Sequence, residues 1–447
     1  MDLSVQGSEF YETPNIDRLA SEGLRFTQAY ATYPRCVPSR GAIMTGRYPA
    51  RDTLYGQMAT ERVTVGEAFR QNGYTTGFVG KWHLGDGKYA PESQGFDVNV
   101  AGGSSGAPPS YFYPYDEANR ESNQGRIDTL KLEDKMEKRT IRGLDEGAKR
   151  GEYLTDRLTS EAVQFIRNHE EEPFFLEVAH YAVHTPVQAR EDIRARHEEK
   201  FEEEMVYTGD SHEYDHTSET KMWQNEASYA AMIHSVDESV GRLMETLEKR
   251  GIAEKTAIVL TSDHGGLSTR VQSSNRNLAT SNRPLRAGKG WLYEGGIRVP
   301  LIVKWPGVIE GGDTTDALVE GVDLYPTMLD MASLPLLPQE HADGRSFASV
   351  LRNPESETGK VLHWHSTSNE RSTGDFKATV IRDGRYKLMH FYGLDKVELY
   401  DLSEDIGEEN NIAGERGNAA EERPEKAEEM MQRLRAWREK MGIEIED

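Results

Sequence analysis

The chain has 447 residues, of which 36% are hydrophobic and 29% charged, and its formal net charge is −23. This length predicts one large α/β domain with a smaller appendage. The acidic balance argues against non-specific nucleic-acid binding, and no apolar run of about 18 residues could cross a bilayer. A single cysteine excludes an internal disulfide, and residues 1–7 lack the basic start and apolar stretch of an export signal.

Strand-like apolar runs alternate with helical patterns along the first three quarters of the chain. The first predicted helix spans 14–21, with Thr13 as cap and Pro14 in the first turn. Thr64 and Glu67 have the spacing of a capping box before a second helix. The longest helical patterns are 153–168 and 223–249, and the predicted strands are 75–79, 173–179, 256–261 and 299–304. This alternation predicts a large, mostly parallel sheet between layers of helices.

Two stretches, 116–150 and 190–220, are rich in charge and poor in core residues, which is typical of surface insertions or lids. After 335–338 the pattern changes to short strands at 378–381, 386–390 and 398–401, followed by a helix at 424–441. We therefore expect a catalytic α/β domain over 1–335. Residues 336–447 are expected to form a subdomain with a small antiparallel sheet and a terminal helix.

The strongest local signal is the run C-V-P-S-R-G-A-I-M-T-G-R that begins at Cys36. Pro38 and Ser39 favour a loop entering a helix, which puts Cys36 just before a helix N-terminus and Arg40 one turn along. Such a position suits an anion. Taken alone, a lone cysteine is more often an inert, buried small residue.

The pattern C-x-P-S-R followed by T-G-R resembles the signature of the type I sulfatases, and further matching motifs extend from Pro14 to about Asn411. The resemblance implies an alkaline phosphatase-like fold and a separate maturation enzyme that oxidises Cys36 to formylglycine. One hydroxyl of the hydrated aldehyde would attack sulfur, and the other, once deprotonated, would release sulfate. A serine would lack that second hydroxyl.

Four basic residues follow predicted strands or lie in glycine-rich turns, where open α/β sheets bind their ligands. By resemblance, Lys81 and Lys289 hold sulfate oxygens, and His83 is the base toward the hydrated aldehyde. Arg40, the two lysines and the metal together supply the positive field that the transition state needs. His184 is expected to protonate the leaving alcohol. Its competitor His180 is nearer the strand and more typical of a structural histidine.

The run I-V-L-T-S-D-H-G-G predicts a buried strand that ends in a glycine turn, with Asp263 and His264 at its end. The resemblance implies that these two residues bind a divalent cation, which in this family is usually calcium. Mg²⁺ or another divalent ion is the alternative, because calcium prefers oxygen ligands. Similar sulfatases open with an apolar strand and two metal-binding aspartates, which are missing before residue 2. Either the start was assigned too late, or a true truncation has weak metal binding; both predict poor stability and low activity for the chain as given.

Arginines 270, 276, 283 and 286 lie between two of these motifs and could bind further anionic groups of a sulfated sugar; a solvated basic loop is the alternative. We expect Arg283, His363 and His365 to contact substrate, whereas Trp364 could stack on a sugar or belong to the core. The predicted function is sulfate removal from a sulfated carbohydrate or another small sulfate ester. The rivals are a phosphonate or phosphate ester hydrolase of the same superfamily and a non-catalytic carbohydrate-binding protein. A periplasmic or extracellular location is expected if an upstream signal was lost.

Overall fold

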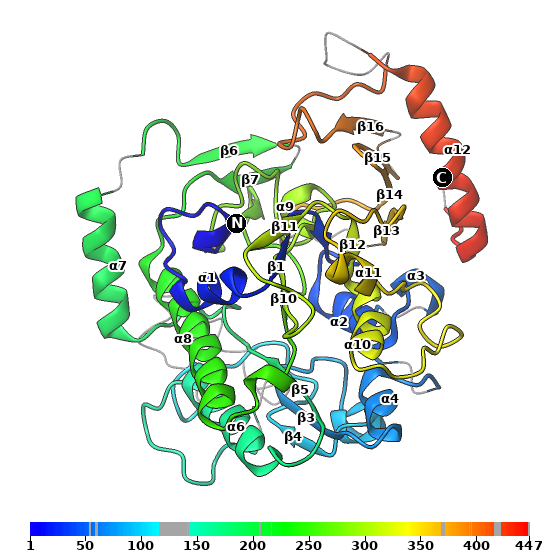
Figure 1. Cartoon of the computed structure of the whole chain (residues 1–447). Helices are drawn as coiled ribbons and strands as arrows, with labels where there is room; N and C mark the ends of the chain where they lie inside the picture. The colour runs from blue at the N-terminus through cyan, green and yellow to red at the C-terminus, as the bar shows by residue number, and fades with distance from the viewer. Residues whose placement is uncertain are drawn as a thin grey trace.

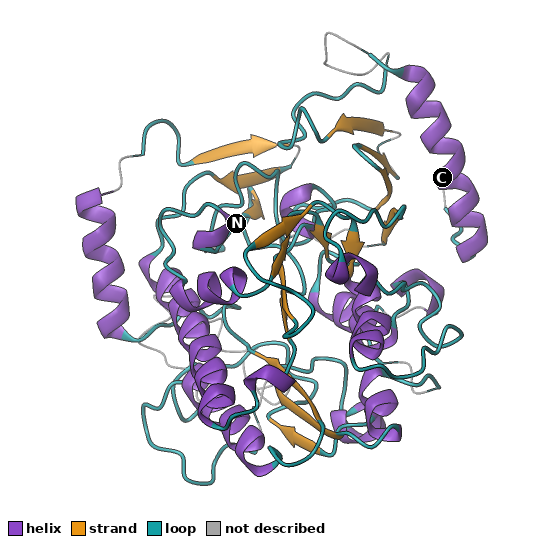
Figure 2. Ribbon diagram, in the orientation of Figure 1, coloured by secondary structure: helices purple, strands orange, loops and turns teal. Residues whose placement is uncertain are grey.

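The computed structural model describes residues 1–52, 55–58, 61–115, 141, 143–204, 207–215, 217–367, 372–392, 394, 396–414 and 422–445. Figure 2 shows strands in the middle of the molecule with helices on both sides. This arrangement confirms the predicted α/β class. Within the described ranges, no helix combines the length and the apolar character that crossing a membrane requires.

A parallel sheet in the order β4-β3-β5 forms one half of the central layer (Figure 1). Its strands are β3 (Thr75–Gly80), β4 (Val98–Val100) and β5 (Phe174–Ala179). The register runs from Thr75 opposite Phe174 to Gly80 opposite Ala179. At Gly80 (φ 108°) a Cβ would come within 2.1 Å of the Ala179 carbonyl oxygen, so only glycine lets the two strand ends lie this close.

The other half is the mixed sheet β11-β1-β10-β8. Its strands are β1 (Leu24–Phe26), β8 (Ile258–Thr261), β10 (Leu301–Lys304) and β11 (Asp313–Thr315). β10 runs antiparallel to both β1 and β8, whereas β1 and β11 are parallel. Between β5 and β8 no pairing joins the two halves within the described residues.

The predicted helices form as expected, because their apolar faces and caps are encoded locally. α1 (Pro14–Ser21) has the predicted bounds, and Thr64 and Glu67 form the predicted capping box of α4 (Val65–Gln71). α6 (Leu154–Asn168) and α8 (Ala227–Lys249) lie side by side against the sheets. The remaining helices with described bounds are α2 (Cys36–Thr45), α3 (Pro49–Asp52), α7 (Glu191–Glu204), α9 (Glu294–Ile297), α10 (Leu324–Met331) and α11 (Ala348–Arg352).

The charged stretch 190–220 contains α7 and the strands β6 (His212–Asp215) and β7 (Ser218–Lys221), which pair with β9 (Thr269–Val271). α7 lies at the rim of the molecule beside α8 (Figure 1). The other charged stretch, 116–150, lies largely outside the described residues. A short parallel pair joins β2 (Ala29–Tyr30) to β12 (Val319–Glu320).

The C-terminal part is the predicted antiparallel sheet, with one strand more than expected. β13 (Val361–Ser366) precedes β14 (Ala378–Asp383), β15 (Tyr386–Phe391) and β16 (Lys396–Asp401). α12 (Pro424–Met441) has the predicted bounds and packs on one face of the sheet. The other face meets the N-terminal part, where the Trp364 indole donates to the Ala31 carbonyl. Trp364 is therefore a core residue.

Candidate active site

Cys36 is the first residue of α2, and its thiol is buried among cationic side chains. Arg35 is extended and donates to Asp375, which fixes the entry of the chain into the helix. The Cys36 Sγ lies 3.2 Å from the Lys81 Nζ, 3.2 Å from the His264 Nε2 and 3.7 Å from the Lys289 Nζ. A side chain only 5% exposed thus faces three basic groups from three distant segments.

This environment makes the sulfur an anion. Burial alone raises the pKa of the Cys36 thiol, but the neighbouring Lys81, His264 and Lys289 outweigh burial and hold that pKa well below the ordinary value. The thiol occupies the place where the oxygens of an oxidised side chain would stand. The pocket therefore stabilises negative charge at the reacting position.

Lys81 and His83 follow β3 and reach the thiol from the same turn. The Lys81 backbone N–H donates to the Ala179 carbonyl at 2.6 Å, which extends the β3–β5 pairing by one residue. His83 has a positive φ of 61°, and its ring interacts electrostatically with Cys36. Its ring lies against Gly106, where a Cβ would come 2.2 Å from the His83 Cε1. Burial lowers the pKa of His83, so the ring is a neutral base.

His184 and Lys289 meet on another side of the thiol. The His184 Nδ1 lies 2.8 Å from the Thr185 carbonyl oxygen and the Nε2 lies 3.3 Å from the Lys289 Nζ. Burial, followed by the charges of Lys289 and Lys81, holds the pKa of His184 well below its usual range. The imidazole is therefore neutral before an anionic ligand arrives. His180 instead bonds to the Ser239 hydroxyl on α8, as expected of a structural histidine.

Asp263 and His264 follow β8, as predicted, and lie beside the thiol. Their ligand atoms and the Cys36 Sγ all lie within 4.8 Å of one another. The Asp263 carboxylate accepts from the Arg40 Nε at 2.9 Å. Burial raises the pKa of Asp263, but His264 and Arg40 outweigh burial and keep the group ionised.

These donors do not by themselves fit a calcium ion. Calcium takes six to eight oxygen ligands, whereas this cluster supplies one carboxylate, one imidazole and one sulfur. The carboxylate is also paired with Arg40, and the lysines beside Cys36 repel a cation. We therefore derive no catalytic step through a metal.

The three residues predicted to contact substrate are not brought to this cluster. Arg283 bonds to Glu213 at 2.7 Å and to Glu409 at 3.2 Å, so carboxylates far along the chain neutralise it. Neither carboxylate is near Arg283 in sequence, so these ion pairs could not be predicted from the motif alone.

His363 and His365 project from the face of β13 that α12 and the end of β15 cover. The His363 ring stacks on Trp437 with a centroid separation of 4.8 Å and an interplanar angle of 8°. The His365 Nδ1 lies 3.0 Å from the Thr379 hydroxyl, and its ring lies against Tyr392. Neither ring has a contact to the cysteine cluster among the described residues.

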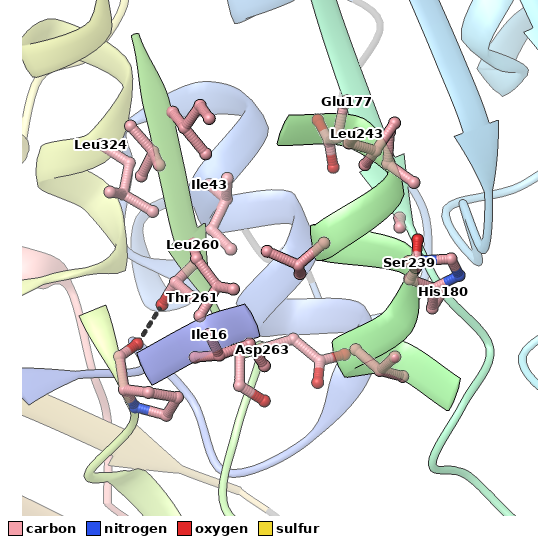
Figure 3. Close-up of a pocket in the computed structure, with 18 of the residues that line it drawn as sticks. Ile16, Ile43, Glu177, His180, Ser239, Leu243, Leu260, Thr261, Asp263 and Leu324 are labelled. Atoms are coloured by element: carbon pink, nitrogen blue, oxygen red, sulfur yellow. Dashed lines mark hydrogen bonds between the residues drawn. The ribbon is translucent and has the colours of Figure 1, made fainter. Parts of the chain in front are cut away.

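Two further residues belong near the site. Glu177 of β5 points into the cavity beside the cluster, and burial raises its pKa to about 7 against the opposing charge of Arg40 (Figure 3). In the sequence, the sign of a functional role for Glu177 is that it is a charged residue inside the apolar run F-F-L-E-V-A. Arg276 lines the same cavity and is close enough to Lys289 to contribute to lowering the pKa of that lysine.

Comparisons with known proteins agree on one family. The family description "Sulfatase" matches residues 1–334, and "N-sulphoglucosamine sulphohydrolase, C-terminal" matches residues 287–440. A "Sulfatase" of Formosa agariphila is 31% identical over 96% of this chain and 84% of its own length. Human arylsulfatase A is 28% identical over 92% of this chain and 80% of its own. The solved structure of Ps i-CgsB in complex with k-i-k-neocarrahexaose superposes with a TM-score of 0.75 at 28% identity, covering 98% of this chain and 89% of that one.

Proposed function

This chain belongs to the sulfatase family and is a sulfuric ester hydrolase, and from that premise we propose that it removes sulfate from a sulfated carbohydrate through a formylglycine made from Cys36. The observation that carries the proposal is the buried Cys36 side chain at a helix start, with the Lys81, His264 and Lys289 nitrogens within 3.7 Å of its sulfur. A separate maturation enzyme would supply the oxidation. Once formed, the hydrated aldehyde offers one hydroxyl as nucleophile and a second whose deprotonation releases sulfate.

Lys81 and Lys289 bind the non-bridging oxygens of the sulfate group in this proposal. Both ammonium groups already point at the reacting position, so they need no rearrangement as negative charge develops there. Arg40 acts indirectly. Its guanidinium donates to the carboxylate of Asp263 and to the backbone carbonyl of Lys81, and so holds both groups in place. These fixed charges explain how a protein with a net charge of −23 binds an anion.

His83 takes a proton from the hydrated aldehyde in this proposal, because its ring is neutral and close enough to Cys36 to interact with it electrostatically. His184 gives a proton to the leaving alcohol. Its Nε2 faces Lys289, so a sulfate bound to that lysine offsets the positive charge that now lowers the pKa of His184. Binding of the anionic substrate would thereby raise the pKa of His184 and let its Nε2 take up a proton from solvent, which the ring then gives to the leaving alcohol.

Arg276 is proposed to bind a second anionic group of the sugar. Of the four arginines in this region, Arg270 pairs with Glu219 and, at 2.7 Å, donates to the Arg276 carbonyl, which positions that residue. Arg286 pairs with Asp215, and Arg283 with two glutamates. Arg276 lines the cavity, and its charge contributes, after burial and Lys81, to lowering the pKa of Lys289.

Matched activities test the proposal. Hydrolysis of a sulfated oligosaccharide, an aryl sulfate and the corresponding aryl phosphonate is measured with protein co-expressed with a maturation enzyme, and with the Cys36→Ala variant; sulfate is measured for the oligosaccharide and the released phenol for the two aryl esters. We expect turnover of both sulfates, lost in the variant. Faster cleavage of the phosphonate would favour the phosphonate hydrolase alternative, and a matured protein that binds the sugar without cleaving it would favour the binding protein.

A pair of variants tests the substrate site. Arg276→Gln should raise KM about tenfold for a sugar that carries a second anionic group and leave KM for a simple aryl sulfate unchanged. Arg283→Gln is the matched control and should change neither. Equal effects of the two variants would refute the role given to Arg276.

A further inference from the structure

Residues 372–375, which precede β14 in the C-terminal part, lie beside the chain that leads into Cys36. The Asp375 Oδ1 accepts from the Arg35 Nη2 at 2.6 Å, and the Thr373 Oγ1 accepts from the same nitrogen at 2.7 Å. The Thr373 hydroxyl also donates to Asp375, and both side chains are buried. Arg35 is therefore held from the C-terminal part, one residue before the reacting side chain.

The same segment contacts the chain that follows Lys289. At Gly290 (φ 100°) a Cβ would come 2.8 Å from the Thr373 Oγ1 and 2.9 Å from the Asp375 Oδ1, so only glycine lets the backbone lie this close. The Gly290 N–H donates to the Pro34 carbonyl at 2.9 Å. The segments that carry the cysteine and the lysine therefore meet at this ion pair.

Further hydrogen bonds hold residues 372–375 in place. The Trp291 indole and the Ser218 hydroxyl both donate to the Thr373 carbonyl, at 3.0 Å and 2.9 Å. The Val271 N–H donates to the Ser372 carbonyl at 3.3 Å. These contacts come from β7, β9 and the turn before α9, so the segment stays anchored when the ion pair with Arg35 is removed.

The position of Arg35 is not the one that stability alone would select. Its Nε is buried and has no hydrogen-bond partner among the described residues, which normally costs free energy. Its partner Asp375 has a carboxylate side chain with no exposed surface, and the attraction within a buried ion pair only partly restores the lost hydration. A costly pair next to the reacting residue fits a role in positioning better than a role in stability.

We propose that Asp375 is a positioning residue, which acts through the Arg35 guanidinium to fix the distance between the side chain of residue 36 and the Lys289 ammonium group. The Cys36 Sγ and the Lys289 Nζ lie 3.7 Å apart. This distance determines how firmly the lysine holds a sulfate group at the reacting position. The role rests on the proposed function of Lys289 in sulfate binding, and it gives a segment outside the cysteine cluster a part in the reaction.

Asp375→Asn tests this role, because asparagine keeps the shape of the side chain and removes its charge. Asp343→Asn is the matched control, since Asp343 also pairs with an arginine, Arg51, at 2.5 Å, and its side chain is 4% exposed. With matured protein and an aryl sulfate, kcat of Asp375→Asn should fall at least about tenfold, and kcat of the control should stay within about twofold of the unaltered chain. Equal kcat values for the two variants at equal aldehyde content would overturn the proposal.

A double variant separates positioning through Arg35 from a loss of packing. Arg35→Gln should lower kcat by the same factor as Asp375→Asn, and the double variant should be no slower than either single variant. Additive losses would overturn the route through Arg35. If Tm shows that Asp375→Asn does not fold, Thr373→Val takes its place, because it removes one acceptor of Arg35 and keeps the ion pair. An unchanged kcat of Thr373→Val would then overturn the proposal.

The unmatured thiol gives a readout that needs no aldehyde. Lys289 contributes to lowering the pKa of Cys36, so moving the two groups apart should raise the midpoint pH of alkylation by iodoacetamide by about 0.5 in Asp375→Asn and leave it unchanged in the control. The same midpoint in both variants would overturn the proposed change of distance. A fully matured but inactive unaltered chain would refute the proposed function instead, whereas equal activity of the unaltered chain and Asp375→Asn would refute only the positioning role.

Discussion

Gly106 offers a way to move His83 without touching its chemistry. A Cβ at this position would stand 2.2 Å from the His83 Cε1, 2.4 Å from the Nε2 and 2.7 Å from the Nδ1. Carbon atoms in contact are separated by about 3.5 Å or more, so Gly106→Ala must displace the ring by more than about 1 Å. A misplacement of that size at a catalytic base lowers the rate about 100-fold.

The control is Gly56→Ala, because no heavy atom lies within 4 Å of the added Cβ and the backbone does not require glycine there. Both variants are matured in the same host, and kcat and KM for an aryl sulfate are measured together with Tm. We expect kcat of Gly106→Ala to fall about 100-fold with KM nearly unchanged. Equal kcat values for the two variants would refute the position and role assigned to His83, as would a loss of activity explained by unfolding alone.

Three further predictions concern the thiol and the C-terminal interface. Lys81→Met removes the lysine that most lowers the pKa of Cys36, so the unmatured thiol should react with iodoacetamide about tenfold more slowly at neutral pH; an unchanged rate would contradict the electrostatics. Trp437→Ala removes a buried indole that packs on His363 and Tyr48, and urea unfolding should show a loss of about 3–5 kcal/mol, whereas a loss below about 1 kcal/mol would refute the packing.

Burial, with a smaller contribution from Arg433, lowers the pKa of His363 to about 3, so the ring is neutral when folded and takes up a proton when unfolded. Its stabilising effect is complete above about pH 6.5 and declines as the pH falls toward 3, by about 2 kcal/mol at pH 4 after allowance for partial exposure. His363→Phe should flatten this decline in urea titrations; an identical decline would exclude His363 as its cause.

Much of the fold follows from short-range signals. Thr64 and Glu67 form the capping box that their spacing predicts, and the bounds of α1 and α12 match their helical patterns. The cysteine cluster could also be predicted from the sequence. Lys81, His184 and Asp263 all follow apolar runs, and the carboxyl ends of these runs meet at one edge.

What the sequence could not predict depends on partners that are distant in the chain. Arg283 is neutralised by Glu409, which lies 126 residues away, and His363 is covered by Trp437 of a later helix. β13 was not predicted as a strand because histidine, tryptophan and serine interrupt the aliphatic pattern by which the other strands were identified.

Conversion of Cys36 from a thiol to an aldehyde is the step on which the proposed mechanism depends, and one measurement tests it directly. Protein co-expressed with a maturation enzyme is digested, and the mass of the peptide that contains Cys36 is determined alongside sulfatase activity in the same sample. We predict that activity rises in proportion to the fraction of peptide that carries the aldehyde in place of the thiol. Full activity in a sample whose residue 36 retains its sulfur in every molecule would contradict the account.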